Sequence, residues 1–202
     1  MIRAALKPQA ETLDNLLAEL RGCRVCAAHL PLGPRPVMRG LPSARLLIIS
    51  QAPGTRVHET GLSFNDRSGD RLRDWLGIDQ TTFYDERRVA IMPMGFCYPG
   101  RDAKGGDLPP RPECAPLWHA RVLAHWSAVE LTLLVGSYAI DYYLPQAKRQ
   151  SMTETVRAWR DAPTGVLPLP HPSWRTTFWQ EKNPWFRRRL VPELRRRVAA
   201  LV

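Results

Sequence analysis

The sequence predicts an α/β protein with three α/β/α layers, in which a central four-stranded parallel sheet lies between helices. Four short runs have the continuous hydrophobicity of strands buried on both faces, namely Arg45–Ser50, Arg88–Met92, Leu131–Gly136 and Gly165–Leu169. Segments with helical spacing separate them, which is typical of parallel strands joined by right-handed crossovers. The 202 residues are enough for one such domain and marginal for two.

The elements follow in order along the chain. Glu11–Arg21 predicts an amphipathic helix that Gly22 ends, and a connector rich in proline and glycine follows over 31–42. The other expected helices are Asp70–Leu76, Ala115–Val129, Tyr138–Leu144, Met152–Arg160 and a basic one over 183–202 that Pro192 kinks or splits. We therefore expect a single domain over 1–202, with an N-terminal helix and C-x-x-C arm (1–42) and a basic C-terminal helix (183–202). Functional residues are expected at the carboxyl ends of the strands.

The composition is that of a globular, strongly basic protein, with 44% hydrophobic and 24% charged residues. A net charge of +10 favours a polyanionic partner, with nucleic acid ahead of an anionic membrane surface. No apolar run reaches the roughly 18 residues of a membrane span. The first residues lack the apolar stretch of a secretory signal, so we expect a cytoplasmic protein. The basic charge adds the expectation that it associates with the nucleoid. A monomer is the default expectation.

Four cysteines are the chain's most specific feature. Cys23 and Cys26 form a C-x-x-C, whereas Cys97 and Cys114 lie far downstream with 16 residues between them. Because cytosolic thiols stay reduced, metal ligation is favoured over two disulfides. The four thiols predict one tetrahedral thiolate site, for an iron–sulfur cluster or a structural zinc, that would clamp the N-terminal segment onto the middle of the fold.

Two strand-end segments, together with the cysteine order, carry a resemblance to a known family. The first strand runs into Gln51-Ala52-Pro53-Gly54 and then GLSFNDRSG over 61–69, and the last runs into His171-Pro172-Ser173. Roughly from Leu20 to Trp179, the chain is similar to the uracil-DNA glycosylase superfamily, most closely to its iron–sulfur branch, family 4. The resemblance implies hydrolysis of the N-glycosidic bond of uracil in DNA, the first step of base excision repair. It also implies a [4Fe–4S] cluster on Cys23, Cys26, Cys97 and Cys114, with zinc less favoured because the second cysteine pair is widely spaced.

The resemblance also implies roles for individual residues. Phe64 would stack on a base rotated out of the DNA, and His171 would hydrogen-bond uracil O2 as negative charge develops there. Ser173 and Arg175 would contact the DNA backbone. The alternatives are an ordinary core aromatic for Phe64, a structural histidine for His171 and a generic loop arginine for Arg175.

The turn after the first strand departs from the family pattern. The backbone N–H groups of Gln51 and Ala52 could reach the base O2, and the Gln51 side chain could position the attacking water. Family 4, however, has Glu at the position of Gln51, and the superfamily's first branch has Asp at the position of Ala52. His58 is the preferred substitute base, ahead of Glu59 and Asp66, although a solvated loop histidine is an equally good interpretation.

Base recognition is the second departure. Pro93 stands where family 4 has an Asn that reads the uracil edge, and proline offers neither a side-chain hydrogen bond nor an N–H. Uracil would then be selected by Asn65 or by the backbone of Met94 and Gly95. Otherwise the substrate is another deaminated or damaged base.

Basic residues fit a DNA partner. Arg101 and Lys104 lie in the loop over 98–112 between two cysteines, and Arg187–Arg189 and Arg195–Arg197 cluster near the C-terminus. A solvated helix face is the alternative for the C-terminal arginines, and it explains Arg187–Arg189 equally well. The motifs contain no lysine, which favours water attack in a monofunctional DNA glycosylase. The alternatives are a catalytically weak DNA-damage-binding protein on the same scaffold and a zinc-stapled nucleic-acid module.

Overall fold

The computed structural model describes residues 11–202, so residues 1–10 of the expected N-terminal arm lie outside the described residues. Its centre is one sheet with the strand order β2-β1-β3-β4, and every neighbouring pair is parallel. The strands are β1 (Leu46–Ser50), β2 (Val89–Pro93), β3 (Leu131–Val135) and β4 (Val166–Leu169). The predicted three-layer α/β/α fold is confirmed.

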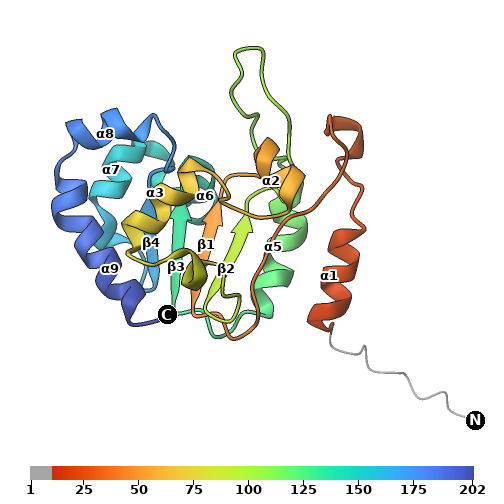
Figure 1. The fold of residues 1–202 in the computed structure, drawn as a ribbon, viewed down its shortest axis with the longest axis horizontal. Helices are drawn as coiled ribbons and strands as arrows, with labels where there is room; N and C mark the ends of the chain where they lie inside the picture. The colour runs from red at the N-terminus through yellow and green to blue at the C-terminus, as the bar shows by residue number, and fades with distance from the viewer. Residues whose placement is uncertain (1–10) are drawn as a thin grey trace, which may run out of the picture.

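The strands form where the sequence is continuously apolar, because helices cover the sheet on both faces. Almost every strand residue is buried. The register pairs Ser50 with Pro93 and Val135 with Leu169, so the carboxyl ends of the strands share one edge of the sheet. In Figure 1 this edge is uppermost, and the loop over 98–112 rises above it.

Helices form the two outer layers. Helix α6 packs on β1 and β3, and α7 packs on β4. Two helix pairs also pack together, namely α3 with α9 and α1 with α5 (Figure 1). The helices are α1 (Leu13–Arg21), α2 (Thr55–Thr60), α3 (Arg67–Leu76), α4 (Gln80–Phe83), α5 (Cys114–Ala124), α6 (Ser137–Tyr143), α7 (Met152–Arg157), α8 (Thr176–Lys182) and α9 (Val191–Ala199). Short 3₁₀ turns occupy Ala27–His29, Pro145–Arg149 and Trp159–Asp161, and a π-helical turn occupies Phe186–Leu190. Within residues 11–202, no helix has the length and apolar character needed to cross a membrane.

Several helix boundaries differ from the sequence predictions. Helix α3 begins three residues early because the Asp66 side chain accepts a hydrogen bond from Gly69 N–H and caps it. Helix α5 ends at Ala124 rather than at Val129. The C-terminal segment is split as expected, since the π-helical turn leads into α9 and Pro192 occupies the first turn of α9.

Candidate active site and four-cysteine site

A cavity of about 680 Å³ opens at the carboxyl edge of the sheet. It lies where β1, β2 and β4 end, and the segment before α3 and the loop over 98–112 complete its wall. The sequence-predicted residues that line it are Gln51, Ala52, Phe64, Arg101, Lys104, His171, Ser173 and Arg175. Residues distant in sequence thus share one concave site of the size that holds a small ligand.

Phe64 is held in an uncommon backbone conformation. Its φ is 56°, in the left-handed region that few residues other than glycine adopt. Its ring packs edge-on against Phe83, with 6.0 Å between ring centroids, and its carbonyl accepts a hydrogen bond from the Tyr84 hydroxyl at 3.1 Å. A Cβ at Gly69 would lie 1.7 Å from the Phe64 carbonyl oxygen, so only glycine fits there. The ring belongs to the core and also lines the cavity, so the two interpretations of Phe64 are compatible.

His171 follows β4 and lies in the same cavity as Phe64. Its carbonyl accepts a hydrogen bond from the Thr176 hydroxyl. Gly136, at the end of β3, has a φ of 91°, and a Cβ there would lie 3.3 Å from His171 Cβ. Burial lowers the pKa of His171, and the charges of Asp66 and Asp107 oppose this shift. The imidazole is therefore a neutral hydrogen-bond donor near pH 7.

The segment after His171 is fixed from α3. The Arg71 guanidinium donates hydrogen bonds to the Ser173 carbonyl and to the Thr177 hydroxyl, the latter at 3.0 Å. Trp174 is 68% exposed at the cavity mouth, and the Arg175 guanidinium lies 5.6 Å from its ring centroid. An exposed cation and an exposed aromatic thus lie beside the cavity, as DNA contact requires.

The ends of β1 and β2 use the backbone donors that were candidates for reading the base. Met94 N–H donates to the Ser50 carbonyl at 2.8 Å, and Gly95 N–H donates to the Gln51 carbonyl at 3.1 Å. The Pro93 carbonyl accepts a hydrogen bond from His119 Nε2 at 3.2 Å. Because these groups are already paired, the wall at Pro93 offers the cavity an apolar surface.

Two predicted site residues do not line the cavity. His58 lies on α2, where its ring is 6.0 Å from the Tyr98 ring, centroid to centroid. Asn65 is partly buried beside the cavity wall. Among the wall residues that the sequence analysis missed are Asp102, Asp107 and Trp174. The polar, glycine-rich loop was the only signal for the two aspartates.

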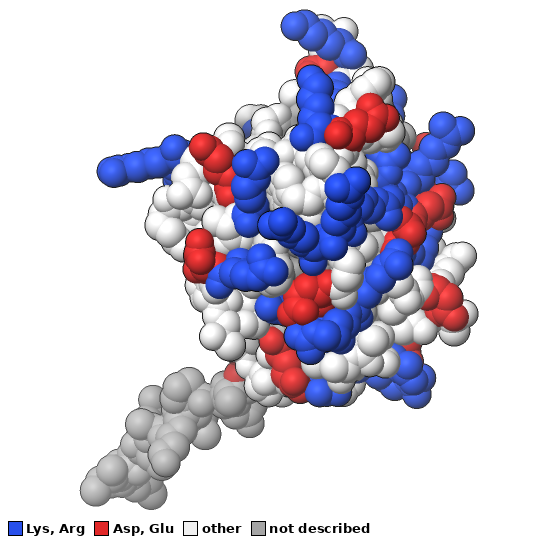
Figure 2. Space-filling view, turned by 90° about the vertical axis from the view of Figure 1, so that its left-hand side faces the viewer, with Lys and Arg blue, Asp and Glu red and all other residues white. Residues whose placement is uncertain are grey.

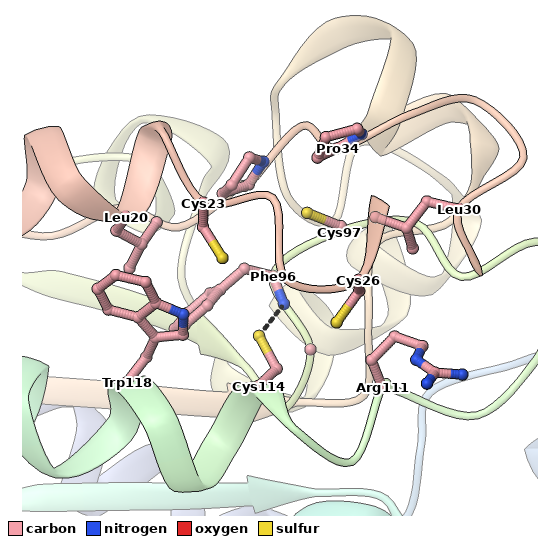
Figure 3. A pocket seen from close by; sticks show the side chains of 12 residues that line it. Leu20, Cys23, Cys26, Leu30, Pro34, Phe96, Cys97, Arg111, Cys114 and Trp118 are labelled. Atoms are coloured by element: carbon pink, nitrogen blue, oxygen red, sulfur yellow. Dashed lines mark hydrogen bonds between the residues drawn. The ribbon is translucent and has the colours of Figure 1, made fainter. Parts of the chain in front are cut away.

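The four cysteines meet in a second, smaller pocket. Cys23 and Cys26 come from the segment after α1, Cys97 follows β2, and Cys114 begins α5. Figure 3 shows their sulfur atoms around one common space. All four cysteines are free thiols. The site joins the N-terminal arm to both ends of the loop over 98–112.

The chemistry of this pocket suits a group bound by thiolates. Burial raises the pKa of Cys97 to about 11 and that of Cys114 to about 12, so a cationic centre is needed to hold them as thiolates. Phe96 N–H donates to Cys114 Sγ at 3.3 Å, and the wall is largely apolar, with Leu20, Leu30 and Trp118. Hydrogen bonds to sulfur and an apolar shell are typical of iron–sulfur sites. The four sulfur atoms surround a common space, but they are not close enough together to hold a single metal ion. The same is true of every other set of three His, Cys, Asp or Glu side chains among residues 11–202.

The C-terminal arginines form part of a face on which basic and acidic side chains are interspersed (Figure 2). Arg187 and Arg195 both pair with Asp74, at 2.6 and 3.2 Å. Arg196 and Arg197 both pair with Glu193. The structure therefore gives these four arginines carboxylate partners, whereas Lys104 and Arg175 at the cavity form no ion pair with any residue between 11 and 202.

A comparison with protein families agrees with this geometry. The family described as the uracil DNA glycosylase superfamily matches residues 38–195, which is more than half of the chain. The match contains the cavity residues after β1 and β4 together with Cys97 and Cys114, and it begins after Cys23 and Cys26. Such membership supports a hydrolase of the DNA glycosylase type with DNA as its substrate. The chain belongs to the uracil-DNA glycosylase superfamily.

Proposed function

We propose that this protein is a monofunctional DNA glycosylase that removes uracil, or a related deaminated base, in base excision repair. The observation that carries the proposal is that Phe64 and His171 line one cavity at the carboxyl edge of the sheet. An extruded base stacks on Phe64, and the neutral His171 donates a hydrogen bond to the charge that develops on the departing base. Water attacks the sugar carbon from which the base leaves.

The base specificity depends on which polar groups of the cavity wall can contact the base. Within the cavity, Pro93 supplies an apolar wall, and the amides of Met94 and Gly95 are paired with β1. Uncharged polar side chains in the wall include those of Ser50, Gln51 and Ser63. Selection between uracil and other deaminated bases then depends on these side chains and on backbone groups after β1.

We further propose a [4Fe–4S] cluster on Cys23, Cys26, Cys97 and Cys114. Bound there, it would act as a structural cross-link. The loop between Cys97 and Cys114 supplies Arg101, Lys104 and Asp107 to the cavity wall, so fixing both ends of this loop orders one side of the site.

A single experiment tests the activity and the specificity together. Oligonucleotides that carry one uracil, hypoxanthine or xanthine, or one mismatch, are incubated with excess protein and then treated with alkali. We expect strand breaks at the uracil. If the protein binds these oligonucleotides without releasing any base, the alternative of a damage-binding protein is correct. That alternative is favoured by the turn after β1, which lacks both carboxylates of the family pattern.

The monofunctional mechanism has its own test, because Lys104 is a lysine in the cavity wall. A lysine that attacks the sugar forms a Schiff base, which borohydride reduces to a stable protein–DNA adduct. We expect no adduct with a uracil-containing duplex. An adduct that disappears in Lys104→Gln would contradict attack by water.

A further inference from the structure

Three carboxylates line the cavity, and they differ in what holds them. Asp66 caps α3, because its Oδ1 accepts a hydrogen bond from Gly69 N–H at 2.9 Å. Asp102 closes the tip of the loop over 98–112, because its Oδ1 accepts from the N–H groups of Lys104 and Gly106. Asp107 receives no backbone hydrogen bond on its carboxylate from residues 11–202, and its ion-pair partner is Arg101, at 3.6 Å. Asp107 is therefore the carboxylate that local structure leaves available.

The loop geometry directs Asp107 into the cavity. Arg101 and Asp107 form an antiparallel bridge across the loop, and Leu108 N–H donates to the Gly100 carbonyl at 2.9 Å just below it. Residues opposite each other on an antiparallel pair project to the same side. Both side chains accordingly line the cavity, and each is about half exposed and open to water.

Asp107 also reaches the turn that follows β1. Its Oδ2 lies 3.6 Å from the position that a Cβ on Gly54 would occupy. Gln51 and Ala52, which carry no carboxylate, belong to this same turn. Asp107 and His171 line the same cavity, and the charge of Asp107 acts to raise the pKa of the imidazole.

We propose that Asp107 is a catalytic residue that accepts a proton from the attacking water, in place of the carboxylate that the turn after β1 lacks. This inference rests on the proposed glycosylase function. The water oxygen forms a bond to the sugar C1′ while the C1′–N bond breaks, and the electron pair of that bond leaves with the base. The proton of the water passes to Asp107 and then to solvent, and the departing anion, bound by His171, is protonated from solvent.

The test compares three variants with the wild type in single-turnover excision from a uracil-containing oligonucleotide. We expect Asp107→Asn to lower the rate by about 100-fold or more, to leave DNA binding unchanged or tighter, and to regain rate when formate is added. Glu59→Gln is the matched control, because it removes a carboxylate from α2 outside the cavity and should leave the rate unchanged.

Two outcomes overturn the assignment of Asp107 while leaving the glycosylase function intact. One is an active wild type with an equally active Asp107→Asn variant. The other is a loss of rate in Asp66→Asn but not in Asp107→Asn, which would place the base on the segment before α3; asparagine keeps the helix cap, so this variant folds. A wild type that excises no base from the full lesion panel contradicts the proposed function itself.

Discussion

At the scale of single residues, His171 illustrates how burial and function combine. Its pKa is lowered by burial, and Gly136 and Thr176 fix its position at the end of β4. A preorganised donor in a cavity stabilises developing charge because it needs no reorganisation during the reaction. The side chain should therefore contribute to the reaction rate far more than to folding.

We predict that His171→Ala lowers single-turnover excision by about 100-fold, the effect of losing a donor worth about 3 kcal/mol. The control is His125→Ala, which changes a histidine at the end of α5, away from the cavity. Excision is measured on an oligonucleotide with one uracil. An undiminished rate in His171→Ala would show that the imidazole has no part in the chemistry.

Gly69 supports the second cavity residue, Phe64, by leaving room for its carbonyl. In Gly69→Ala the new methyl group would overlap that carbonyl, so the segment before α3 has to move. We expect a loss of about 1–3 kcal/mol in the free energy of unfolding, measured with urea, together with reduced excision. Gly22→Ala is the control, since φ there is −80° and the nearest atom would be 3.4 Å away. Equal stability of the two variants would contradict the tight contact.

At the scale of elements, one buried histidine ties three elements together behind the cavity. His119 on α5 is 1% exposed. Its Nε2–H donates to the Pro93 carbonyl at the end of β2, so its Nδ1 accepts from the Tyr143 hydroxyl on α6, at 2.7 Å. Burial lowers the pKa of His119 to about 4, from an ordinary value of 6.5. The folded protein therefore keeps this histidine neutral at pH values where the unfolded chain protonates it.

This difference makes stability depend on pH with a definite sign. Between pH 6.5 and about 4 the unfolded state binds the proton and the folded state does not, so the free energy of unfolding falls as the pH falls. We expect His119 to account for about 3 kcal/mol of this loss, since each pKa unit corresponds to about 1.4 kcal/mol. Urea unfolding of the wild type and of His119→Gln at several pH values measures the contribution of His119 to this pH dependence. If the free energy of unfolding changes with pH in the same way in both proteins, His119 does not make this contribution.

The elements also show what local sequence can and cannot predict. The four strands were predicted closely because a strand buried on both faces is continuously apolar. Helices α2, α4 and α8 were missed because α2 and α4 each contain one apolar residue and α8 contains two adjacent ones, so none of them shows helical spacing of apolar residues. Helices α6 and α7 are equally short, but their apolar residues recur at that spacing.

In the candidate site, too, local sequence predicted some residues and long-range folding decided the others. Phe64 and His171 were proposed because both belong to motifs of the family that the chain resembles, and the structure places both in the cavity wall. His58 was favoured among the residues near Gln51 because an imidazole suits a base near neutral pH, but α2 carries it out of the cavity wall toward Tyr98. Asp107 lies more than fifty residues after the turn that follows β1, and only the folding of its loop brings it there. The pairing of the Met94 and Gly95 amides is likewise a long-range contact.

At the scale of the whole molecule, the four cysteines connect the N-terminal arm to the cavity. We expect the purified protein to be brown and to contain iron and acid-labile sulfide in equal amounts. Cys23→Ser should lose both, expose the segment between α1 and β1 to proteolysis, and lower excision because the loop over 98–112 loses its anchor. Metal analysis and limited proteolysis measure these changes. Stoichiometric zinc without sulfide would contradict the cluster.

The distribution of charge over the whole molecule makes the last prediction. With a net charge of +10, binding to DNA should weaken steeply with salt, and each phosphate contact contributes about one unit to the slope of log affinity against log salt. Arg175 is exposed at the cavity mouth, whereas Arg187 is paired with Asp74 at 2.6 Å. Arg175→Gln should therefore reduce the slope by about one, while Arg187→Gln, which removes the same charge, should leave it nearly unchanged. The slope is measured by titrating product duplex, which carries an abasic site, at several salt concentrations. Equal reductions in both variants would place the DNA on the C-terminal arginine face as well as on the cavity mouth.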